Sequence, residues 1–457
     1  MSVLDINIPE NVKFVIERLE SRGYEAFIVG GCVRDSLLGI KPNDYDIATN
    51  ALPEQTINCF FDCYVIETGV KHGTVTVVYK GENIEITTYR IDGEYKDHRR
   101  PEHVSFTDDL TLDLSRRDFT INAMAYSDRT GIIDRFGGQK DLFNHLIRCV
   151  GEPSERFGED ALRIIRALRF ASKLDFGIES LTSLAIHDMR HSLDKISNER
   201  IRDELVKFLM GRAPAELMIE YSDVFTSIIP EMRRCINFDQ HSRYHIYDVW
   251  EHTAYSVEYS KPEKDVRLAL FFHDIEKPSC FRFDDEGNGH FPNHEKKGAD
   301  TTENIMKRLH FDNATIASVS TLVRYHYVTP VDDSSVVKHL LSKLGEKTLT
   351  KLFEVMKGDS RAKQSFCLER VPVVDAMKIR MYEIISNNEC YSQADLAVDG
   401  NDVAAAGFSG KEIGNALEKL LMMVMDNQVE NSKPALEKVM SDPTFTAEIT
   451  LKTNNII

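Results

Sequence analysis

The sequence predicts an α+β protein, in which an N-terminal part combines a mixed sheet with helices and the rest of the chain is helical. Short runs rich in β-branched residues, such as residues 73–79 and 83–87, alternate with turns up to about residue 150. After Gly151 the apolar residues recur with helical periodicity to the end of the chain. With 457 residues the chain has room for roughly two to four domains with sizeable cores.

Composition narrows the classes of protein. The chain is 42% hydrophobic and 28% charged, which is typical of a soluble globular protein. No run of about 18 apolar residues is present, so we expect no membrane span. The first nine residues lack the basic and apolar regions of a signal peptide, which predicts a cytoplasmic location. Eight scattered cysteines without a Cys-x-x-Cys pair predict reduced, mostly structural thiols.

The charge of the chain is unevenly distributed. A formal net charge of −17 argues against indiscriminate nucleic-acid binding by a basic surface. Arginines nevertheless concentrate in one region of the sequence, at Arg90, Arg99, Arg100, Arg116, Arg117, Arg163, Arg166 and Arg169. An acidic protein with one arginine-rich region is expected to bind a particular polyanion in a particular place.

A glycine pair follows the first apolar run. Residues 27–29 predict a strand, and Gly30 and Gly31 open a helix that begins near Cys32. Glycine lets backbone N–H groups approach an anion closely, and the N-terminus of the helix adds a partial positive charge. The turn is therefore expected to hold phosphate without a lysine.

A pair of aspartates follows this helix. On a predicted short strand, Asp44 and Asp46 point to the same face while Tyr45 turns away. Two adjacent carboxylates repel each other unless cations share them, and Mg²⁺ prefers such hard oxygen ligands together with substrate phosphates. Two ions roughly 3.5–4 Å apart would activate an attacking hydroxyl and stabilise a leaving pyrophosphate.

Glu85 is a candidate third carboxylate beside the two aspartates, and these motifs can also be interpreted as an ordinary turn and ordinary surface residues. Residues 84–90 alternate like a strand, and Glu85 on it would complete a carboxylate cluster, although glutamates on strands are commonly just exposed. A Gly-Gly turn alone is usually a simple turn, and a lone Asp-x-Asp is usually solvated surface. Their order, within about 20 residues of each other, favours a triphosphate site.

A helix predicted over residues 158–170 carries the second candidate site. Asp160 and Arg163 lie at i and i+3, so they are surface neighbours and form either a modest intrahelical ion pair or a base-reading pair. Cytosine and adenine both present an amino donor beside an unprotonated ring nitrogen. A carboxylate that accepts from the amino group and an arginine that donates to the ring nitrogen would accept C and A and reject U and G.

Together these residues resemble the class II tRNA nucleotidyltransferases, which comprise the CCA-adding enzymes and their bacterial poly(A) polymerase relatives. The resemblance covers nearly the whole chain. Its motifs are residues 27–46, residues 90–101 with Val104 and Phe106, residues 114–123, residues 159–163 and residues 197–201. It implies an enzyme that extends the tRNA 3′ end with CMP and then AMP, from CTP and ATP and without a nucleic-acid template.

The resemblance also implies roles for individual residues. Asp44 and Asp46 would hold two Mg²⁺ ions, and the strand pattern of residues 84–90 adds Glu85 as the expected third catalytic carboxylate. Asp118 would also help to couple the head to the neck. The residues expected to bind the nucleotide are Gly30, Gly31, Arg34, Arg117, Asp118, Asn122, Asp160, Arg163, Arg166 and Arg169.

A second group of residues resembles the HD phosphohydrolase motif. His252, the adjacent pair His273 and Asp274, and the distant Asp359 match its ligands, a set of nitrogen and oxygen donors suited to a divalent transition metal. His294 and His326 match accessory histidines of that family. Any single histidine is also a common structural residue, and Glu276 stands where the family usually has glycine.

The resemblance divides the chain into four parts. These are a nucleotidyltransferase head at 1–150, a neck that binds nucleotide and RNA at 151–235, an HD-type body at 236–370 and a tRNA-binding tail at 371–457. The intact loop of residues 92–100 argues against a CC-adding enzyme. An A-adding enzyme, a poly(A) polymerase, an HD phosphodiesterase or phosphatase acting on RNA ends, and a non-catalytic RNA scaffold remain alternatives, and no oligomeric state is predicted.

Overall fold

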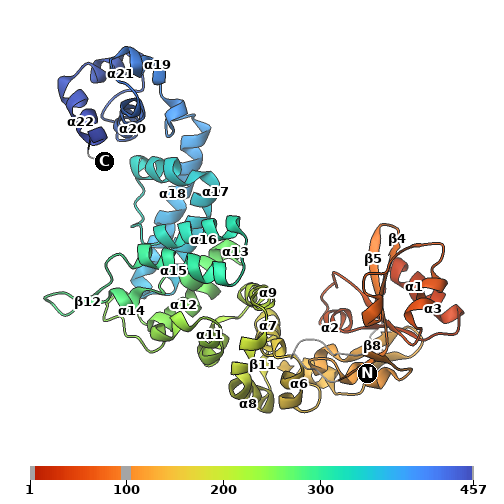
Figure 1. Ribbon diagram of the computed structural model, residues 1–457. Coiled ribbons are helices and arrows are strands. Elements are labelled where there is room, and N and C mark those ends of the chain that lie inside the picture. Colours follow the sequence, from red (N-terminus) through yellow and green to blue (C-terminus); the bar gives the residue numbers. More distant parts are fainter. Residues whose placement is uncertain (1–5, 94–103, 455–457) are drawn as a thin grey trace. The chain divides into compact units, whose positions relative to one another are not determined.

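A computed structural model describes residues 6–93 and 104–454 (Figure 1). Residues 94–103, which include Arg99, Arg100 and most of the loop predicted at residues 92–100, lie outside the described residues. The chain divides into two compact units, which are described separately below. Unit 1 comprises residues 1–233 with 308–311, and unit 2 comprises residues 234–307 with 312–457.

The predicted mixed sheet is confirmed in unit 1. Seven strands lie in the order β3-β4-β5-β2-β1-β8-β9, and β2 and β5 are parallel while the other neighbours are antiparallel. Their bounds are β1 (Ala26–Val29), β2 (Asp46–Thr49), β3 (Tyr64–Ile66), β4 (Thr74–Tyr79), β5 (Glu82–Thr88), β8 (Met124–Ser127) and β9 (Gly131–Asp134). A separate short hairpin pairs β6 (Arg90–Asp92) with β7 (Val104–Phe106).

Helices pack against this sheet because they have one apolar face. The first helix, for example, buries Val12, Val15, Ile16 and Leu19. The helices of this part are α1 (Glu10–Ser21), α2 (Gly31–Leu37), α3 (Pro53–Cys59), α4 (Leu110–Ser115) and α5 (Gly138–Phe143). Every residue of β1 is buried, which places the turn after it, at Gly30, at the edge of the core.

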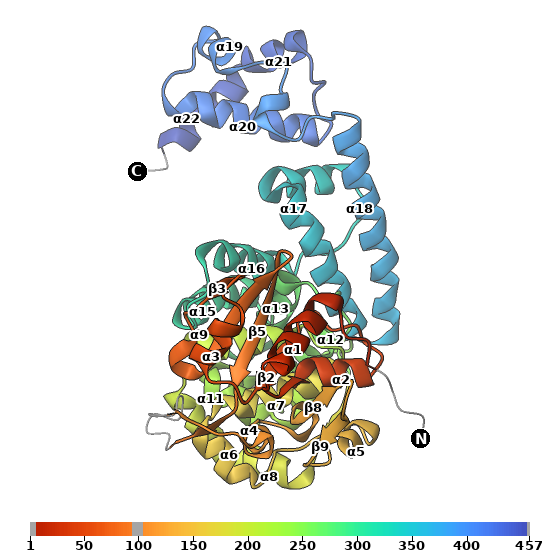
Figure 2. The ribbon, with the colours of Figure 1, turned by 90° about the vertical axis from the view of Figure 1, so that its right-hand side faces the viewer.

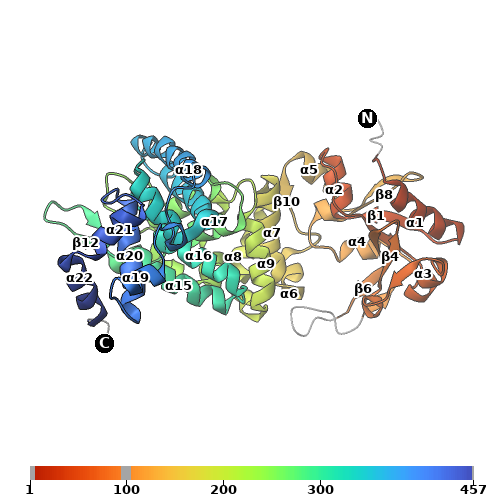
Figure 3. The ribbon, with the colours of Figure 1, turned by 90° about the horizontal axis from the view of Figure 1, so that it is seen from above.

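The rest of unit 1 is helical. Its helices are α6 (Pro153–Glu159), α7 (Leu162–Leu174), α8 (Ser180–Met189), α9 (Asn198–Leu209), α10 (Ala215–Glu220) and α11 (Ser222–Ile228). In Figure 1 and Figure 3, α7 and α9 lie side by side. The expectation that only helices follow residue 150 is wrong in a detail, because β10 (Leu146–Ile147) pairs in parallel with β11 (Gly177–Ile178).

Unit 2 is built from helices, with one short hairpin of β12 (Arg282–Phe283) and β13 (Gly289–His290). The helices are α12 (Val249–Glu258), α13 (Lys264–Phe272), α14 (Lys277–Cys280), α15 (His294–Arg308), α16 (Asn313–Tyr325), α17 (Ser334–Arg361), α18 (Arg370–Ser386), α19 (Gly400–Ala405), α20 (Lys411–Met425), α21 (Lys433–Met440) and α22 (Pro443–Asn454). Figure 2 shows α17 and α18 side by side. Gly345 interrupts α17 with a positive φ of 73°.

Two expectations from composition can be compared with the fold. No helix within residues 6–93 and 104–454 combines the length and apolar content that a bilayer-spanning segment requires. All eight cysteines lie in the described part of the chain and are free thiols, most of them buried.

Candidate functional site

A cavity of about 960 Å³ in unit 1 collects the residues predicted to bind nucleotide and metal. It is lined by the turn after β1, the start of β2, the middle of β5 and the helices α7 and α9. Every predicted site residue of the head and neck lines it, namely Gly30, Gly31, Arg34, Asp44, Asp46, Glu85, Arg117, Asp118, Asn122, Asp160, Arg163, Arg166 and Arg169. Residues separated by up to about 140 positions in the sequence therefore share one wall.

The glycine turn forms as expected. Gly30 has a φ of 77°, and a Cβ there would lie 2.8 Å from the Arg117 guanidinium, so a side chain at this position is strained and crowded. Gly31 is the first residue of α2. Burial, reinforced by the charge of Asp46, raises the pKa of the neighbouring Cys32 thiol to about 11, so this thiol is neutral.

The acidic residues are arranged differently from the predicted Asp-x-Asp strand. The second strand begins at Asp46, opposite Val29, and Asp44 lies in the loop before it. The strand is shorter because β1 ends where Gly30 turns the backbone away from its neighbour. Asp46 is instead paired in register with Glu85 of the parallel strand β5, so these two carboxylates lie on adjacent strands.

Electrostatics indicate an unbalanced negative charge at this point. Burial raises the pKa of the Asp46 carboxyl, the charges of Glu85 and Asp44 raise it further, and only Arg117 opposes them. A divalent cation would relieve this repulsion, so the oxygen donors of these residues fit a hard metal ion. Among the described residues, groups of three candidate ligand atoms within 4.8 Å of one another occur in unit 2, and these carboxylates do not form one.

A hydrogen-bonded chain crosses the cavity wall from α2 to α7. Arg34 donates to the Asn122 side chain (2.5 Å), and Asn122 donates to Asp118 (3.0 Å). Arg166 then donates to the other Asp118 oxygen, at 2.9 and 2.5 Å. Burial alone would raise the pKa of Asp118, but Arg166 and the Asn122 amide outweigh burial and lower it to about 2. Asp118 thus links the end of the head to the first long neck helix.

The helix predicted over residues 158–170 is broken at Asp160. The helix α6 ends at Glu159 and α7 begins at Leu162, with Asp160 extended between them. One Asp160 oxygen accepts from the Leu162 N–H (3.1 Å) and the other from Arg200 (2.7 Å). The interpretation as an intrahelical ion pair with Arg163 is therefore wrong, because the aspartate is used to begin the second helix.

Arg163 is 8% exposed and has its own partners. Its guanidinium donates to the Glu159 carboxylate (2.6 Å) and to the backbone oxygens of Arg156 (3.1 Å) and Arg116 (2.8 Å). A guanidinium has five N–H donors. Arg163 therefore keeps donors for a ligand while the other contacts hold it in place.

Two residues of α9 hold site residues in place and were not among the predicted site residues; Arg200 also lines the cavity. Arg200 holds Asp160, and Glu204 pairs with Arg169 at 3.1 Å. Glu204 is only 5% exposed. The sequence motif at residues 197–201 singled out the segment that contains Arg200. The spacing within this motif does not indicate which of its residues contacts Asp160.

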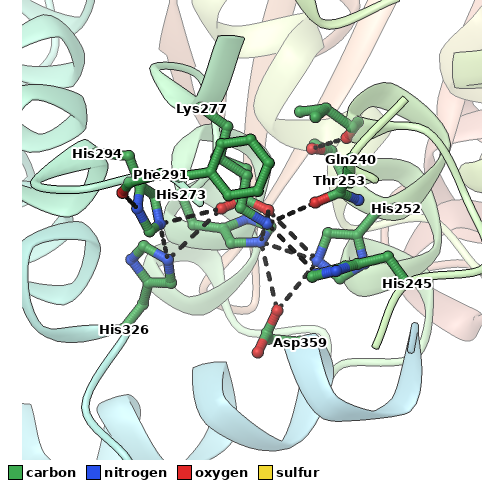
Figure 4. Close-up of polar contacts among 12 residues, drawn as sticks. Gln240, His245, His252, Thr253, His273, Lys277, Phe291, His294, His326 and Asp359 are labelled. Atoms are coloured by element: carbon green, nitrogen blue, oxygen red, sulfur yellow. Dashed lines mark hydrogen bonds and ion pairs between the residues drawn. The ribbon is translucent and has the colours of Figure 1, made fainter. Parts of the chain in front are cut away.

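The predicted HD ligands meet in the core of unit 2 (Figure 4). His252 Nε2 lies 3.0 Å from Asp359 Oδ1 and 3.4 Å from Asp274 Oδ2. His273 Nε2 lies 3.1 Å from Asp274 Oδ2 and 3.6 Å from Asp359 Oδ1. We call these four residues, with His294 and His326, the histidine centre.

The two accessory histidines form a second triad around the same aspartate. His294 Nε2 and His326 Nε2 lie 3.5 and 3.6 Å from Asp274 Oδ1, and 3.3 Å from each other. Asp274 therefore offers one oxygen to each of two groups of possible metal ligands. Both groups are buried.

The four rings are oriented alike. Each Nδ1 lies within hydrogen-bond distance of a backbone carbonyl, that of Ala362 for His252 (3.0 Å), Leu270 for His273 (2.6 Å), Phe291 for His294 (2.7 Å) and Val323 for His326 (2.6 Å). A carbonyl only accepts, so Nδ1 carries a proton and Nε2 points to the centre, where a ring in its neutral form can offer its lone pair to a metal ion. This is the arrangement that metal-binding histidines use, and the donor set fits a transition metal.

Lysines accompany both aspartates. Lys277 Nζ lies 2.7 Å from Asp274 Oδ2, and Lys363 Nζ lies 2.6 Å from Asp359 Oδ2. A cavity of about 550 Å³ opens onto these residues and onto Arg243, Tyr244 and Arg370, among others. Lysines and arginines therefore lie beside the centre, where they can contact an anionic substrate, although Asp284 and Glu286 also line this cavity.

Glu276 departs from the HD pattern but does not enter the centre. It is 2% exposed, and its carboxylate is bound by Arg234, by Thr301 (2.7 Å) and by Lys297 (3.1 Å). The larger side chain is thus accommodated by a separate set of partners.

Comparisons with known proteins agree with this architecture. Residues 26–148 match the family model for the poly A polymerase head domain, residues 175–235 the model for a probable RNA- and SrmB-binding site of polymerase A, and residues 296–440 the model for tRNA nucleotidyltransferase domain 2. The CCA-adding enzyme of Lactobacillus helveticus is 35% identical over 94% of this chain and 96% of its own length.

Solved structures of CCA-adding enzymes resemble this chain over nearly its whole length. The Bacillus stearothermophilus CCA-adding enzyme in complex with CTP is 27% identical, with a TM-score of 0.73 over 96% of this chain and 98% of its own. The Thermotoga maritima CCA-adding enzyme complexed with tRNA shares the fold, with a TM-score of 0.57 over 96% of this chain and 97% of its own, at 20% identity. On its sequence, its cavity of acidic and basic residues and these relatives, the chain belongs to the family of CCA-adding tRNA nucleotidyltransferases.

Proposed function

We propose that this protein completes the 3′ end of tRNA by adding CMP and AMP, from CTP and ATP, without a nucleic-acid template. The observation that carries the proposal is that Asp44, Asp46 and Glu85 line the same cavity as the arginines of α7. The relatives support the substrates, because their solved structures include complexes with CTP, ATP and tRNA. Because the substrate is tRNA, we also propose a cytoplasmic location, which microscopy of the tagged chain would check.

Membership of this family implies use of a divalent metal ion. We propose that Asp44 and Asp46 hold two Mg²⁺ ions with help from Glu85, because like charges raise the pKa of Asp46 and hard oxygens suit this ion. When bound, Mg²⁺ lowers the pKa of an attacking hydroxyl and neutralises charge on the triphosphate. The glycine turn and Arg117 then leave room and positive charge for the phosphates beside the carboxylates.

Base selection is assigned to Asp160 and Arg163. The carboxylate accepts from the exocyclic amino group of cytosine or adenine, and a remaining N–H of Arg163 donates to the ring nitrogen. The contacts of Arg163 to Glu159 and to two backbone oxygens keep its guanidinium in one orientation during this step. An unpaired group opposite uracil or guanine costs about 1–3 kcal/mol.

The test is extension of three tRNA transcripts, which lack CCA, end after the first C, or end after the second C, with labelled CTP and ATP. We expect CMP on the first two and AMP after the second C. Incorporation of AMP alone, only after CC, would identify an A-adding enzyme, and a long A tail would identify a poly(A) polymerase. Binding of tRNA without any Mg²⁺-dependent product would identify a scaffold.

We propose a second activity for unit 2, namely phosphohydrolysis at RNA ends by the histidine centre. The four Nε2 atoms and two aspartates that converge there favour it, as do the lysines and arginines among the residues that line the adjoining cavity. The test is release of phosphate from RNA oligonucleotides with terminal or cyclic phosphates, with Mn²⁺, Co²⁺ or Ni²⁺ supplied. If the wild-type protein binds none of these metals, the proposed phosphohydrolysis is refuted. If His273→Ala loses all activity, including nucleotide addition, the HD centre is the main site.

A further inference from the structure

Phe170 is the aromatic residue in the wall of the nucleotide cavity. It lies on α7, is 6% exposed and lines the cavity. Its ring meets the ring of Phe119 edge to face, with 5.8 Å between centroids and an angle of 78° between planes. Phe119 is fully buried. The Phe170 ring thus packs against a residue of the hydrophobic core, Phe119.

Three guanidinium groups surround this ring. The central carbon of Arg169 lies 4.1 Å from the ring centroid, that of Arg34 5.0 Å and that of Arg166 5.5 Å. Arg34 comes from α2, one turn after the glycine pair, whereas the other two lie on the same helix as the ring. All three arginines line the cavity. The ring is the contact that they share.

Each guanidinium also has an acidic partner of its own. Arg34 pairs with Asp35 (2.7 Å), Arg166 with Asp118 and Arg169 with Glu204 (3.1 Å). Asn122 and Asp118 link Arg34 to Arg166, but the ion pair of Arg169 with Glu204 is separate, so polar contacts alone do not gather all three cations. Burial lowers the pKa of Arg169 to about 10, and the like charges of Arg166 and Arg34 act in the same direction.

An aromatic ring attracts cations to its face, and this attraction is strongest where water is excluded. The ring therefore offsets part of the mutual repulsion of the three guanidiniums. Leucine or methionine at this position would fill similar space without that attraction.

We infer that Phe170 is a positioning residue, which holds Arg34, Arg166 and Arg169 together to bind the triphosphate of the incoming nucleotide. This inference rests on the proposed nucleotidyltransferase function. The phosphates are common to CTP and ATP, so the role is separate from base selection by Asp160. Loss of the ring should therefore weaken the binding of CTP and the binding of ATP by the same factor.

The experiment compares Phe170→Leu and Phe170→Met with Phe170→Tyr, which keeps the ring. Phe208→Leu is the matched control, because Phe208 is a fully buried phenylalanine of α9 outside the cavity lining. We expect the two aliphatic variants to raise the KM for CTP and for ATP about tenfold each, with kcat within about threefold. The tyrosine variant should stay within about twofold of the wild type.

A second readout does not depend on tRNA. Inorganic tripolyphosphate should raise the thermal midpoint of the wild type and of Phe208→Leu, and raise it less for the aliphatic variants. Unchanged KM values, an altered ratio of CTP to ATP use, or an equal effect in Phe208→Leu would overturn the inference. Absence of nucleotide addition by the wild type would instead refute the proposed function, and the tripolyphosphate comparison would still decide the role of Phe170.

Discussion

Arg200 donates a 2.7 Å hydrogen bond to the carboxylate of Asp160, and this contact joins the first turn of α9 to the start of α7. The other Asp160 oxygen accepts from the Leu162 N–H. The aspartate is therefore held from two sides, in a position where it lines the nucleotide cavity. Its orientation therefore depends on a residue of α9, 40 positions away in the sequence.

Replacing Arg200 should relax base selection. In Arg200→Met the Asp160 carboxylate loses its charged partner and can rotate, so discrimination of CTP and ATP against UTP and GTP should fall about tenfold. Arg202→Met on the same helix is the control, because Arg202 pairs with Asp203 instead. The measurement is misincorporation into a tRNA that ends after the second C. Equal fidelity in both variants would exclude this role of Arg200.

Replacing the carboxylates should affect nucleotide addition in a graded way. Asp44→Asn and Asp46→Asn should each reduce the rate on the order of a thousandfold, since both remove a charge from the proposed metal ligands. Glu85→Gln should reduce it less, because Glu85 acts beside Asp46 on the next strand. Single-turnover extension with varied Mg²⁺ measures this. A variant Asp46→Asn with full activity would contradict the proposed site.

The ion pair between Asp118 and Arg166 should make stability depend on pH. The pKa of Asp118 is lowered to about 2, so its contribution is present above the usual carboxyl range near 4 and is lost as the pH falls toward 2. The shift corresponds to about 2 kcal/mol. Asp118→Asn should therefore melt below the wild type at pH 7, and the gap should narrow between pH 4 and pH 2. Asp128→Asn, at an exposed carboxyl, should show no such trend.

Gly358 should be required for the histidine centre. A Cβ at Gly358 would lie 2.7 Å from Leu270 Cδ1 and 3.0 Å from the Ser256 oxygen, so Gly358→Ala pushes α17 away and displaces the adjacent Asp359. We expect a loss of about 1–3 kcal/mol and weaker metal binding. Gly414→Ala, on α20 with open space around it, should be neutral or slightly stabilising. Thermal melting with and without Mn²⁺ would compare them.

The two triads around Asp274 should be separable by metal titration. If each holds an ion, the wild type binds two equivalents of Mn²⁺ or Ni²⁺, and His294→Gln, which alters only the second triad, binds one. Calorimetry with elemental analysis measures the number bound. A single equivalent in both proteins would assign His294 and His326 to a supporting role.

Some of this protein was predictable from local sequence. The Gly30 and Gly31 turn, the helix that follows it and the strand that carries Glu85 form where their residues indicate, because backbone freedom and side-chain alternation act over a few residues. The predicted strand begins only at Asp46 and leaves Asp44 in the loop before it, and the predicted helix is broken at Asp160. In the first case the paired strand β1 ends at Val29, opposite Asp46. In the second case Arg200, which is distant in sequence, binds the Asp160 carboxylate.

The sequence by itself determined the fold class and the family. It also determined which of the predicted residues belong to the nucleotide cavity and which to the histidine centre, since motifs and periodicity are properties of short segments. Only the tertiary structure decided the pairings. Arg200 with Asp160, Arg34 with Asn122 and His252 with Asp359 are 40, 88 and 107 residues apart, respectively. Such contacts depend on how helices and strands pack, and packing selects among many compatible partners by shape, burial and charge that no short stretch of sequence contains.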